Sequence, residues 1–159
     1  MKKNRILDTS GILRSRLDFS NFRYHITNSV LHELKDENVK AAIESAIKSG
    51  NVILSEASDE YVAKVIEKAR ETGDIMKLSN TDIEILAVAL EKNLSIVTDD
   101  YSIQNVASHL NLDYEPVTQN GIKRSVKWKK ICPFCDREYH SDKKECDVCG
   151  SKLRRIAYY

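Results

Sequence analysis

Short apolar segments alternate with helical patterns along residues 1–118 of this 159-residue chain, and this alternation restricts its fold more than any other feature. Five segments have the length and composition of β-strands: 4–7, 24–27, 52–54, 95–97 and 114–117. Four others carry apolar residues at helical spacing: 28–34, 38–48, 60–72 and 101–110. A further helix, over 82–90, is apolar almost all round and should be central and buried. Strands that alternate with helices form a parallel sheet with helices on both faces, so we expect an α/β fold.

Five acidic residues follow these strands or lie in the first turns of the next helix: Asp8, Glu33, Asp82, Asp99 and Asp100. Parallel α/β sheets bind ligands at the carboxyl ends of their strands, because loops and helix N-termini converge there. Mg²⁺ and Mn²⁺ prefer carboxylate and water oxygens as ligands. The acidic cluster therefore predicts a metal site that can polarise a phosphodiester and activate water against it.

Most of these acids also have a purely structural interpretation. Asp82 closes a Ser-x-x-Asp pattern typical of a capping box. Asp99 or Asp100 could cap the helix that begins near residue 101, and Asp8 could be a turn residue before a small, turn-compatible run. Glu33 fits neither role, because no choice of cap puts it at the third helical position. It also shares a helical face with apolar residues, where a charge needs a partner.

All four cysteines lie within eighteen residues, as two Cys-x2-Cys pairs: Cys132, Cys135, Cys146 and Cys149. This spacing is typical of a structural Zn²⁺ site, whose closed tetrahedral shell leaves no position for a reacting water. A module this small needs such a staple, so we expect a zinc ribbon over 131–159, with the Phe134 ring in its small core. Three histidines have no partner spacing that indicates catalysis, and we expect them to be structural: His25, His32 and His109. Four thiolates already complete the zinc shell, so we expect His140 to be exposed on the hairpin between the two cysteine pairs rather than to be a ligand.

The formal net charge of +1 conceals two parts of opposite sign. Residues 1–120 hold 14 Lys and Arg against 19 Asp and Glu, a net −5, whereas residues 121–159 hold 11 against 5, a net +6. Clustered cations attract phosphate, and interleaved aromatic rings stack on unpaired bases. The alternative is a solvated charged surface. We expect the C-terminal segment to bind single-stranded RNA through these residues: Lys123, Arg124, Lys127, Trp128, Lys129, Lys130, Lys143, Lys144, Lys152, Arg154 and Arg155.

Composition also suggests where the chain works and how it is divided. No apolar run approaches the ~20 residues of a membrane helix, and the first residues do not form a signal peptide, so we expect a cytoplasmic protein without a membrane partner. The pattern predicts an α/β domain over 1–118, a basic linker over 119–130 and the zinc ribbon over 131–159.

Four stretches, taken in order, resemble the PIN-domain ribonucleases: ILDTS at 6–10, TNSVLHEL at 27–34, LSNTD at 78–82 and IVTDDYSIQNVA at 96–107. Their order is shared widely among such domains and indicates a PIN-like, Rossmann-like sheet. The stretch DDYSIQNV at 99–106, followed by WKKICPFC at 128–135, is more specific. It resembles the PIN enzymes that carry a zinc ribbon and act in maturation of the small ribosomal subunit.

The resemblance implies a single-strand-specific endoribonuclease that uses Mg²⁺ or Mn²⁺. Asp8, Glu33, Asp82 and Asp100 stand at the family's acidic positions, and the adjacent Asp99 is a further candidate. The implied substrate is the 3′ end of precursor 16S rRNA in the pre-30S particle, where assembly factors are potential partners.

Three other functions compete with this interpretation. A non-catalytic RNA-binding assembly factor would use only the tail, but all four acidic positions are filled. A toxin-type PIN ribonuclease would leave the zinc ribbon unexplained. A phosphoaspartyl phosphatase would need a second aspartate two residues after Asp8, where Ser10 stands.

Overall fold

A computed structural model of the chain describes residues 1–118, 121–122 and 124–159. Its larger part is a parallel five-stranded sheet in the order β3-β2-β1-β4-β5. The strands are β1 (Lys3–Leu7), β2 (Phe22–Ile26), β3 (Val52–Leu54), β4 (Ser95–Val97) and β5 (Tyr114–Glu115). The predicted α/β fold with a parallel sheet is confirmed, although β5 is shorter than expected.

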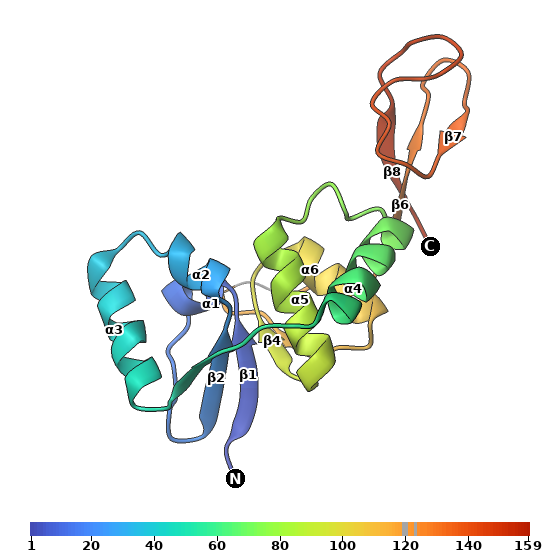
Figure 1. Cartoon of the computed structure of the whole chain (residues 1–159). Helices are drawn as coiled ribbons and strands as arrows, with labels where there is room; N and C mark the ends of the chain where they lie inside the picture. The colour runs from blue at the N-terminus through green and yellow to red at the C-terminus, as the bar shows by residue number, and fades with distance from the viewer. Residues whose placement is uncertain (119–120, 123) are drawn as a thin grey trace.

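Six helices cover the two faces of the sheet (Figure 1). One side carries α1 (Thr9–Arg14), α2 (Asn28–Glu33) and α3 (Glu37–Lys48), and the other carries α4 (Asp59–Thr72), α5 (Asn80–Lys92) and α6 (Tyr101–His109). None of the helices in the described part of the chain is long and apolar enough to cross a bilayer.

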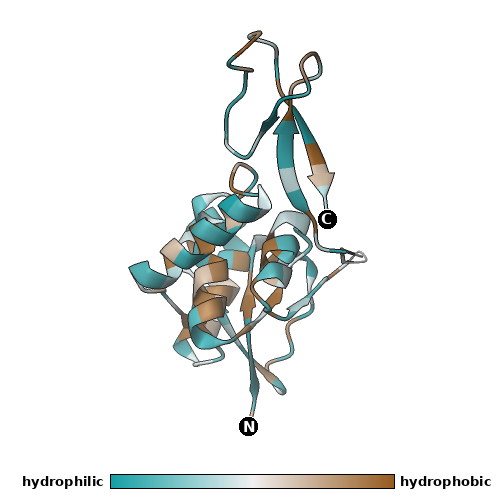
Figure 2. Cartoon of the chain, turned by 90° about the vertical axis from the view of Figure 1, so that its right-hand side faces the viewer, coloured by the Kyte–Doolittle hydropathy of each residue, from teal (hydrophilic) through white to brown (hydrophobic). Residues whose placement is uncertain are grey.

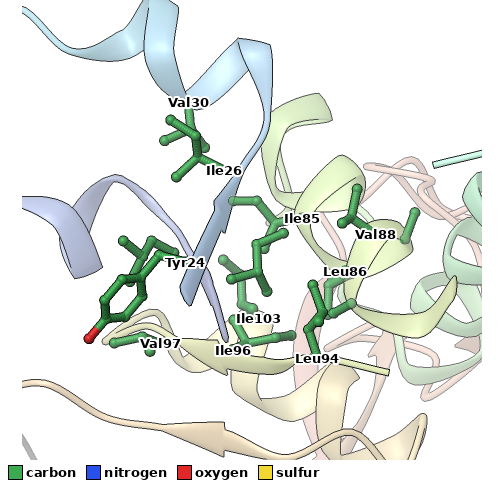
Figure 3. Packing of buried hydrophobic residues seen from close by; sticks show 14 of the residues in the cluster. Tyr24, Ile26, Val30, Ile85, Leu86, Val88, Leu94, Ile96, Val97 and Ile103 are labelled. Atoms are coloured by element: carbon green, nitrogen blue, oxygen red, sulfur yellow. The ribbon is translucent and has the colours of Figure 1, made fainter. Parts of the chain in front are cut away.

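Helix α5 forms the centre of the core, as its apolar sequence predicts. Ile85, Leu86 and Val88 are fully buried, and Figure 3 shows them beside Ile96 of β4 and Ile103 of α6. Burial of each such side chain stabilises the fold by about 1.5–3 kcal/mol. The helix is therefore fixed tightly against the sheet, and so is the position of its first turn.

Helix α1 is the element that the sequence did not predict. We expected a turn after Asp8, whereas the structure has a six-residue helix that Asp8 caps. Six residues are too few for a hydrophobic period to be recognised. Gly11 lies inside this helix because a Cβ there would come within 2.6 Å of the Val97 carbonyl oxygen, so the glycine permits close packing against β4.

The C-terminal part is a small antiparallel sheet of β6 (Lys127–Ile131), β7 (Glu138–Tyr139) and β8 (Arg154–Tyr158), in the order β7-β6-β8. Strand β6 takes in residues 127–130, which we expected in the linker. Figure 2 shows that this ribbon projects from the larger part and is mostly hydrophilic. Its core consists of two cysteines with Tyr139 and Leu153.

The ribbon is joined to the α/β part by a partly buried ion pair. Asp74, which is 2% exposed, follows α4 and lies 3.3 Å from a guanidinium nitrogen of Arg155 in β8. The same nitrogen donates to the Gly73 carbonyl oxygen at 3.0 Å, and the guanidinium stacks 4.0 Å from the centre of the Trp128 ring. Asn105 of α6 holds the preceding segment by bonding both the N–H and the carbonyl of Val126.

Candidate active site

The five predicted acids surround one open pocket of about 330 Å³ at the carboxyl edge of the sheet. Asp8 follows β1, Asp99 and Asp100 follow β4, Glu33 ends α2, and Asp82 lies in the first turn of α5. Four separate stretches of sequence thus meet at one place, as the topology of a parallel sheet requires.

Two acids of the pocket, Asp8 and Asp82, have a raised pKa. Asp8 is the more buried of the two, with 6% of its surface exposed. One carboxylate oxygen accepts hydrogen bonds from the Gly11 N–H (2.6 Å) and the Ser10 hydroxyl (2.7 Å), and the other accepts one from the Thr98 hydroxyl. Burial raises the pKa of Asp8, and the charge of Asp100 raises it further, while these hydrogen bonds oppose the shift. The side chain is therefore held rigidly beside a second negative charge.

Asp82 is both a capping residue and part of the pocket. Its Oδ2 accepts a bond from the Ser79 N–H at 2.8 Å, and its own N–H donates to the Ser79 hydroxyl at 3.1 Å, which completes a capping box. The structural interpretation of the Ser-x-x-Asp pattern is therefore confirmed. The box uses Oδ2, and the Asp82 side chain also lines the pocket. Burial raises the pKa of Asp82, as do the charges of Asp100 and Asp8.

Asp100 also caps a helix, α6, but from the N-cap position itself. Its Oδ1 accepts bonds from the N–H groups of Ser102 (2.7 Å) and Ile103 (3.3 Å), so it is the N-cap of the helix. Glu33 is exposed at the end of α2, and its carboxylate accepts a bond from the Thr9 hydroxyl at 2.8 Å. Thr9 is thus the partner that a charge at this position needed.

Asp99 has a different environment from the other four acids. Its two oxygens accept bonds from the Val117 and Thr118 N–H groups and the Thr118 hydroxyl, at 2.6–3.3 Å. The Thr118 hydroxyl above all, helped by the backbone bonds and Arg14, lowers the pKa of Asp99 to about 2. Asp99 therefore anchors the segment after β5 as a permanent anion.

Several pocket residues were not predicted from the sequence. Arg14, at the end of α1, is a cation in the pocket wall and lies 3.6 Å from Asp99. The hydroxyls of Thr9, Ser10 and Thr98 hold the carboxylates. Small hydroxyl residues beside Asp8, Asp82 and Asp99 were visible in the sequence, but Arg14 could not be assigned because its helix was not predicted.

The chemistry of the pocket fits a hard divalent cation. Its donors are carboxylates, which such ions prefer. The charge of Asp100 helps to raise the pKa of both Asp8 and Asp82, so a bound cation would offset repulsion that the protein otherwise tolerates. Arg14 provides a further positive charge for an anionic substrate.

The four cysteines form a second group that could hold a metal ion. Their sulfur atoms all lie within 4.8 Å of one another, with Cys132 and Cys149 3.4 Å apart and Cys135 and Cys146 3.6 Å apart. Sulfurs ~2.3 Å from a tetrahedral ion lie roughly 3.8 Å apart, close to this spacing. The Tyr139 hydroxyl contacts the Cys146 sulfur at 3.2 Å. The group fits a zinc ribbon.

The basic residues proposed to bind RNA differ in how much of their charge remains available. Lys129 pairs with Glu138, Lys143 pairs with Asp147, and Arg155 points inward to Asp74. Lys130 donates to two backbone carbonyls, and Trp128 is half-buried under Arg155. Five residues of this proposed set are exposed and have no ion pair in the described part of the chain: Arg124, Lys127, Lys144, Lys152 and Arg154. Lys123 lies outside the described residues.

The expected position of Phe134 was wrong. Its ring is 80% exposed, because the interior of the ribbon is filled by the cysteines, Tyr139 and Leu153. Two histidines have structural partners, since His25 bonds the Ser55 hydroxyl at 2.8 Å and His109 bonds the Val126 carbonyl at 3.0 Å. His32 and His140 are exposed.

We expect Asp82→Asn to raise the Tm of the protein by a few degrees near pH 7 when the pocket holds no divalent ion. The pKa of Asp82 is higher in the folded than in the unfolded state, so its charge lowers the free energy of unfolding at a pH above the folded-state pKa. This loss of stability is gone once the pH falls below the unfolded-state pKa near 3.8. An asparagine keeps an acceptor for the Ser79 N–H. Thermal unfolding from pH 3 to 8, with both proteins in the same buffers, measures the difference between them. A lower Tm for the variant at pH 7 would contradict this account.

Known proteins match both the sequence and the fold. A family model described as "PIN domain of ribonuclease" matches residues 6–91. The endoribonuclease Nob1 of Methanothermobacter thermautotrophicus is 32% identical over 98% of this chain and 92% of its own length, and other archaeal proteins of that name are 35–38% identical. The ribonuclease VapC1 of Thermoplasma acidophilum is 35% identical over 94% of this chain and 76% of its own length.

A solved structure supports the fold alone. VapBC2 of Rickettsia felis, crystallised with a promoter DNA fragment, aligns with a TM-score of 0.54 at 18% identity, over 71% of this chain and 98% of the matched chain. The sequence matches carry the family assignment, because they extend over nearly the whole chain and include the cysteine-bearing segment. The chain belongs to the PIN-domain endoribonucleases, in the group that includes archaeal Nob1.

Proposed function

We propose that the chain cleaves single-stranded precursor small-subunit rRNA near its 3′ end, with the acidic pocket as its catalytic site. Asp8, Glu33, Asp82 and Asp100 would hold Mg²⁺ or Mn²⁺, and Asp99 would orient the wall beside them. The observation that supports this most is the convergence of the acids from four parts of the chain around one open pocket, with burial and mutual repulsion raising the pKa of Asp8 and Asp82.

The chain's own residues prepare the pocket for hydrolysis. The caps on α1, α5 and α6 fix Asp8, Asp82 and Asp100 before any substrate arrives, so little reorganisation is needed. Divalent cations bound there supply electrostatic stabilisation of the charge that develops at the phosphodiester. Arg14 would contact the phosphate from the other wall of the pocket.

The reaction in this proposal is attack of water on phosphorus. A new P–O bond forms with the water oxygen, the P–O3′ bond breaks, and the departing O3′ takes a proton. The products are a 5′-phosphate and a 3′-hydroxyl. The RNA's own 2′-hydroxyl has no part in the step.

The ribbon would hold the RNA while the pocket cuts it. Zn²⁺ bound by Cys132, Cys135, Cys146 and Cys149 would keep the ribbon folded, and its closed shell gives it no catalytic part. Five exposed cations of the ribbon and the residues before it would contact phosphates: Arg124, Lys127, Lys144, Lys152 and Arg154. In this proposal the protein acts on the pre-30S particle in the cytoplasm, with assembly factors as further partners.

The relatives favour the ribosomal substrate over the two alternatives. The archaeal proteins that align with almost the whole of this chain are named endoribonucleases. Their names favour an enzyme over a non-catalytic assembly factor. The relative named VapC1 covers 94% of the chain, so its similarity extends beyond the PIN domain. A toxin-type role remains less well supported because it gives the cysteine-bearing ribbon no task.

Cleavage of a defined fragment tests the proposal. The full-length protein, with zinc retained, should cut a fragment that spans the 3′ end of precursor 16S rRNA once Mn²⁺ or Mg²⁺ is added. End-mapping should place the cut at one or a few adjacent positions in a single-stranded stretch. A protein that binds the fragment without cutting it under any divalent ion would support the assembly-factor alternative.

We expect a 2′-deoxy nucleotide on the 5′ side of the scissile phosphate to leave cutting within a few-fold of that of the all-RNA substrate. Attack by water does not need the 2′-hydroxyl, whereas attack by the RNA itself does. Single-turnover cleavage of matched oligonucleotides, with the products' ends identified by mass, gives the answer. Complete loss of cutting, or a cyclic phosphate among the products, would contradict the water mechanism.

A further inference from the structure

A second cleft of about 450 Å³ lies where the ribbon meets the α/β part. One wall is the end of α4 and the segment that follows it, including Arg70, Met76 and Lys77. The other wall is the ribbon, including Trp128 and His140. Nothing in the acidic pocket uses these residues, and the two pockets have no lining residue in common.

The walls of the cleft are held in place without a ligand. The partly buried Asp74–Arg155 ion pair connects them, and Arg155 itself lines the cleft. Gly73 has a positive φ of 77°, and a Cβ there would come within 2.6 Å of the Trp128 Cβ. The two backbones therefore touch at the base of the cleft. A ligand that enters meets a surface that needs little ordering, which favours binding.

The lining combines apolar surface with positive charge. Met76 is 55% exposed, and the ring of His140 is exposed on the opposite wall. Among the described residues that line the cleft, five are Lys or Arg and one, Asp142, is acidic. Arg70 and Lys77 are exposed and form no ion pair within the described part of the chain. A flat, partly apolar group that carries negative charge matches this surface, and an unpaired nucleotide is such a group.

The cleft and the acidic pocket are joined by one short segment. Lys77 lines the cleft, and Thr81, four residues later, lines the acidic pocket. Four residues of extended chain span at most about 15 Å, so the two sites are a few nucleotides apart along a single strand. We propose that the cleft binds one unpaired nucleotide of the RNA substrate close to the scissile phosphate, and so helps to select where the strand is cut. This inference rests on the proposed nuclease function and deepens it.

Abasic scanning of the substrate tests the subsite. Each RNA of a single-stranded set has one abasic position, and the set covers the positions on both sides of the cut. Each RNA is bound to the full-length protein with zinc retained and no Mg²⁺ or Mn²⁺ added. We expect the affinity to fall about ten-fold or more at one or two adjacent positions and to change little elsewhere. An equal affinity at every position would overturn the proposal.

Variants identify the cleft as the source of that position dependence. Met76→Ala and His140→Ala should weaken binding of the intact RNA and reduce the penalty at the sensitive position to two-fold or less. Lys77→Glu should weaken binding of every RNA in the set, while Lys48→Glu, on an exposed lysine of α3, should not. A sensitive position that persists in both alanine variants would overturn the proposal.

The outcome is separable from that of the nuclease proposal. If the protein cuts RNA with divalent ions but shows no sensitive position, the cleft inference fails and the catalytic assignment stands. If it cuts nothing and still shows a sensitive position that depends on Met76 and His140, the cleft stands and the catalytic assignment fails. A last outcome is that an acidic peptide displaces RNA from the wild-type protein but not from the alanine variants, while RNA binding shows no dependence on any base. The occupant of the cleft would then be a protein, and the proposal would be overturned.

Discussion

Asp82→Asn should reduce RNA cleavage at least about 100-fold while the affinity for RNA stays within two-fold of that of the wild type. Loss of one electrostatic contact to a transition state typically costs 10² to 10³ in kcat. The substitution removes a charge from the pocket but preserves the capping box geometry that begins α5. Single-turnover cleavage with Mn²⁺, together with RNA binding in its absence, separates the two effects.

Asp99→Asn is the matched comparison, because it removes a charge from the same pocket. We expect this variant to unfold at a lower temperature, since Asp99 is a low-pKa anion that accepts bonds from the Val117 and Thr118 N–H groups. The wild-type advantage should be present above the unfolded pKa near 3.8 and be lost as the pH falls through about 2. Equal losses of RNA affinity and cleavage in Asp82→Asn would argue against separate sites for binding and chemistry.

Neutralising four exposed ribbon cations to Gln should weaken RNA binding at least ten-fold at low salt and reduce its salt slope by about two to three. The set is Lys127, Lys144, Lys152 and Arg154, which have no ion pair in the described part of the chain. Each phosphate contact to a single strand contributes roughly 0.7 to the slope. Affinities measured across a salt series give both quantities.

The control for this experiment changes the same net charge elsewhere. Four exposed cations at or near the amino edge of the sheet are suitable: Lys2, Arg23, Lys48 and Lys92. Their conversion to Gln should leave the salt slope almost unchanged. If both quadruple variants lose the same affinity and slope, the RNA responds to overall charge rather than to the ribbon.

The sequence predicted the positions of the acids better than their individual surroundings. The order of strands and helices was enough to bring Asp8, Asp82 and Asp100 to one edge, because a parallel sheet puts the carboxyl ends of its strands together. It could not distinguish Asp99 from Asp100, since the two are adjacent and only the tertiary contact with Thr118 makes one of them an anchor. Capping a helix and lining the acidic pocket are compatible roles for one aspartate, because its carboxylate has two oxygens.

In the ribbon, the sequence predicted the metal site but not how the side chains around it are arranged. The cysteine spacing predicted their convergence, because two such pairs can close one tetrahedral shell. The Phe134 ring was misplaced, because its position depends on what fills the interior. The pairing of Arg155 with Asp74 was not predicted, because it depends on what faces the ribbon. Asp74, the buried partner of Arg155, carries no local sequence signal beyond its place after a glycine.

The helix-capping role of three of these acids affects how such enzymes can evolve. At Asp8, Asp82 and Asp100 the fold requires only a short side chain with an oxygen that accepts a backbone N–H, and asparagine satisfies that requirement as well as aspartate does. A single-nucleotide change between an aspartate and an asparagine codon can therefore produce a well-folded relative that grips RNA and no longer cuts it. Duplicated copies of such a gene have a short route to becoming RNA chaperones or competitors of the parent enzyme, and selection on stability alone would not oppose that route.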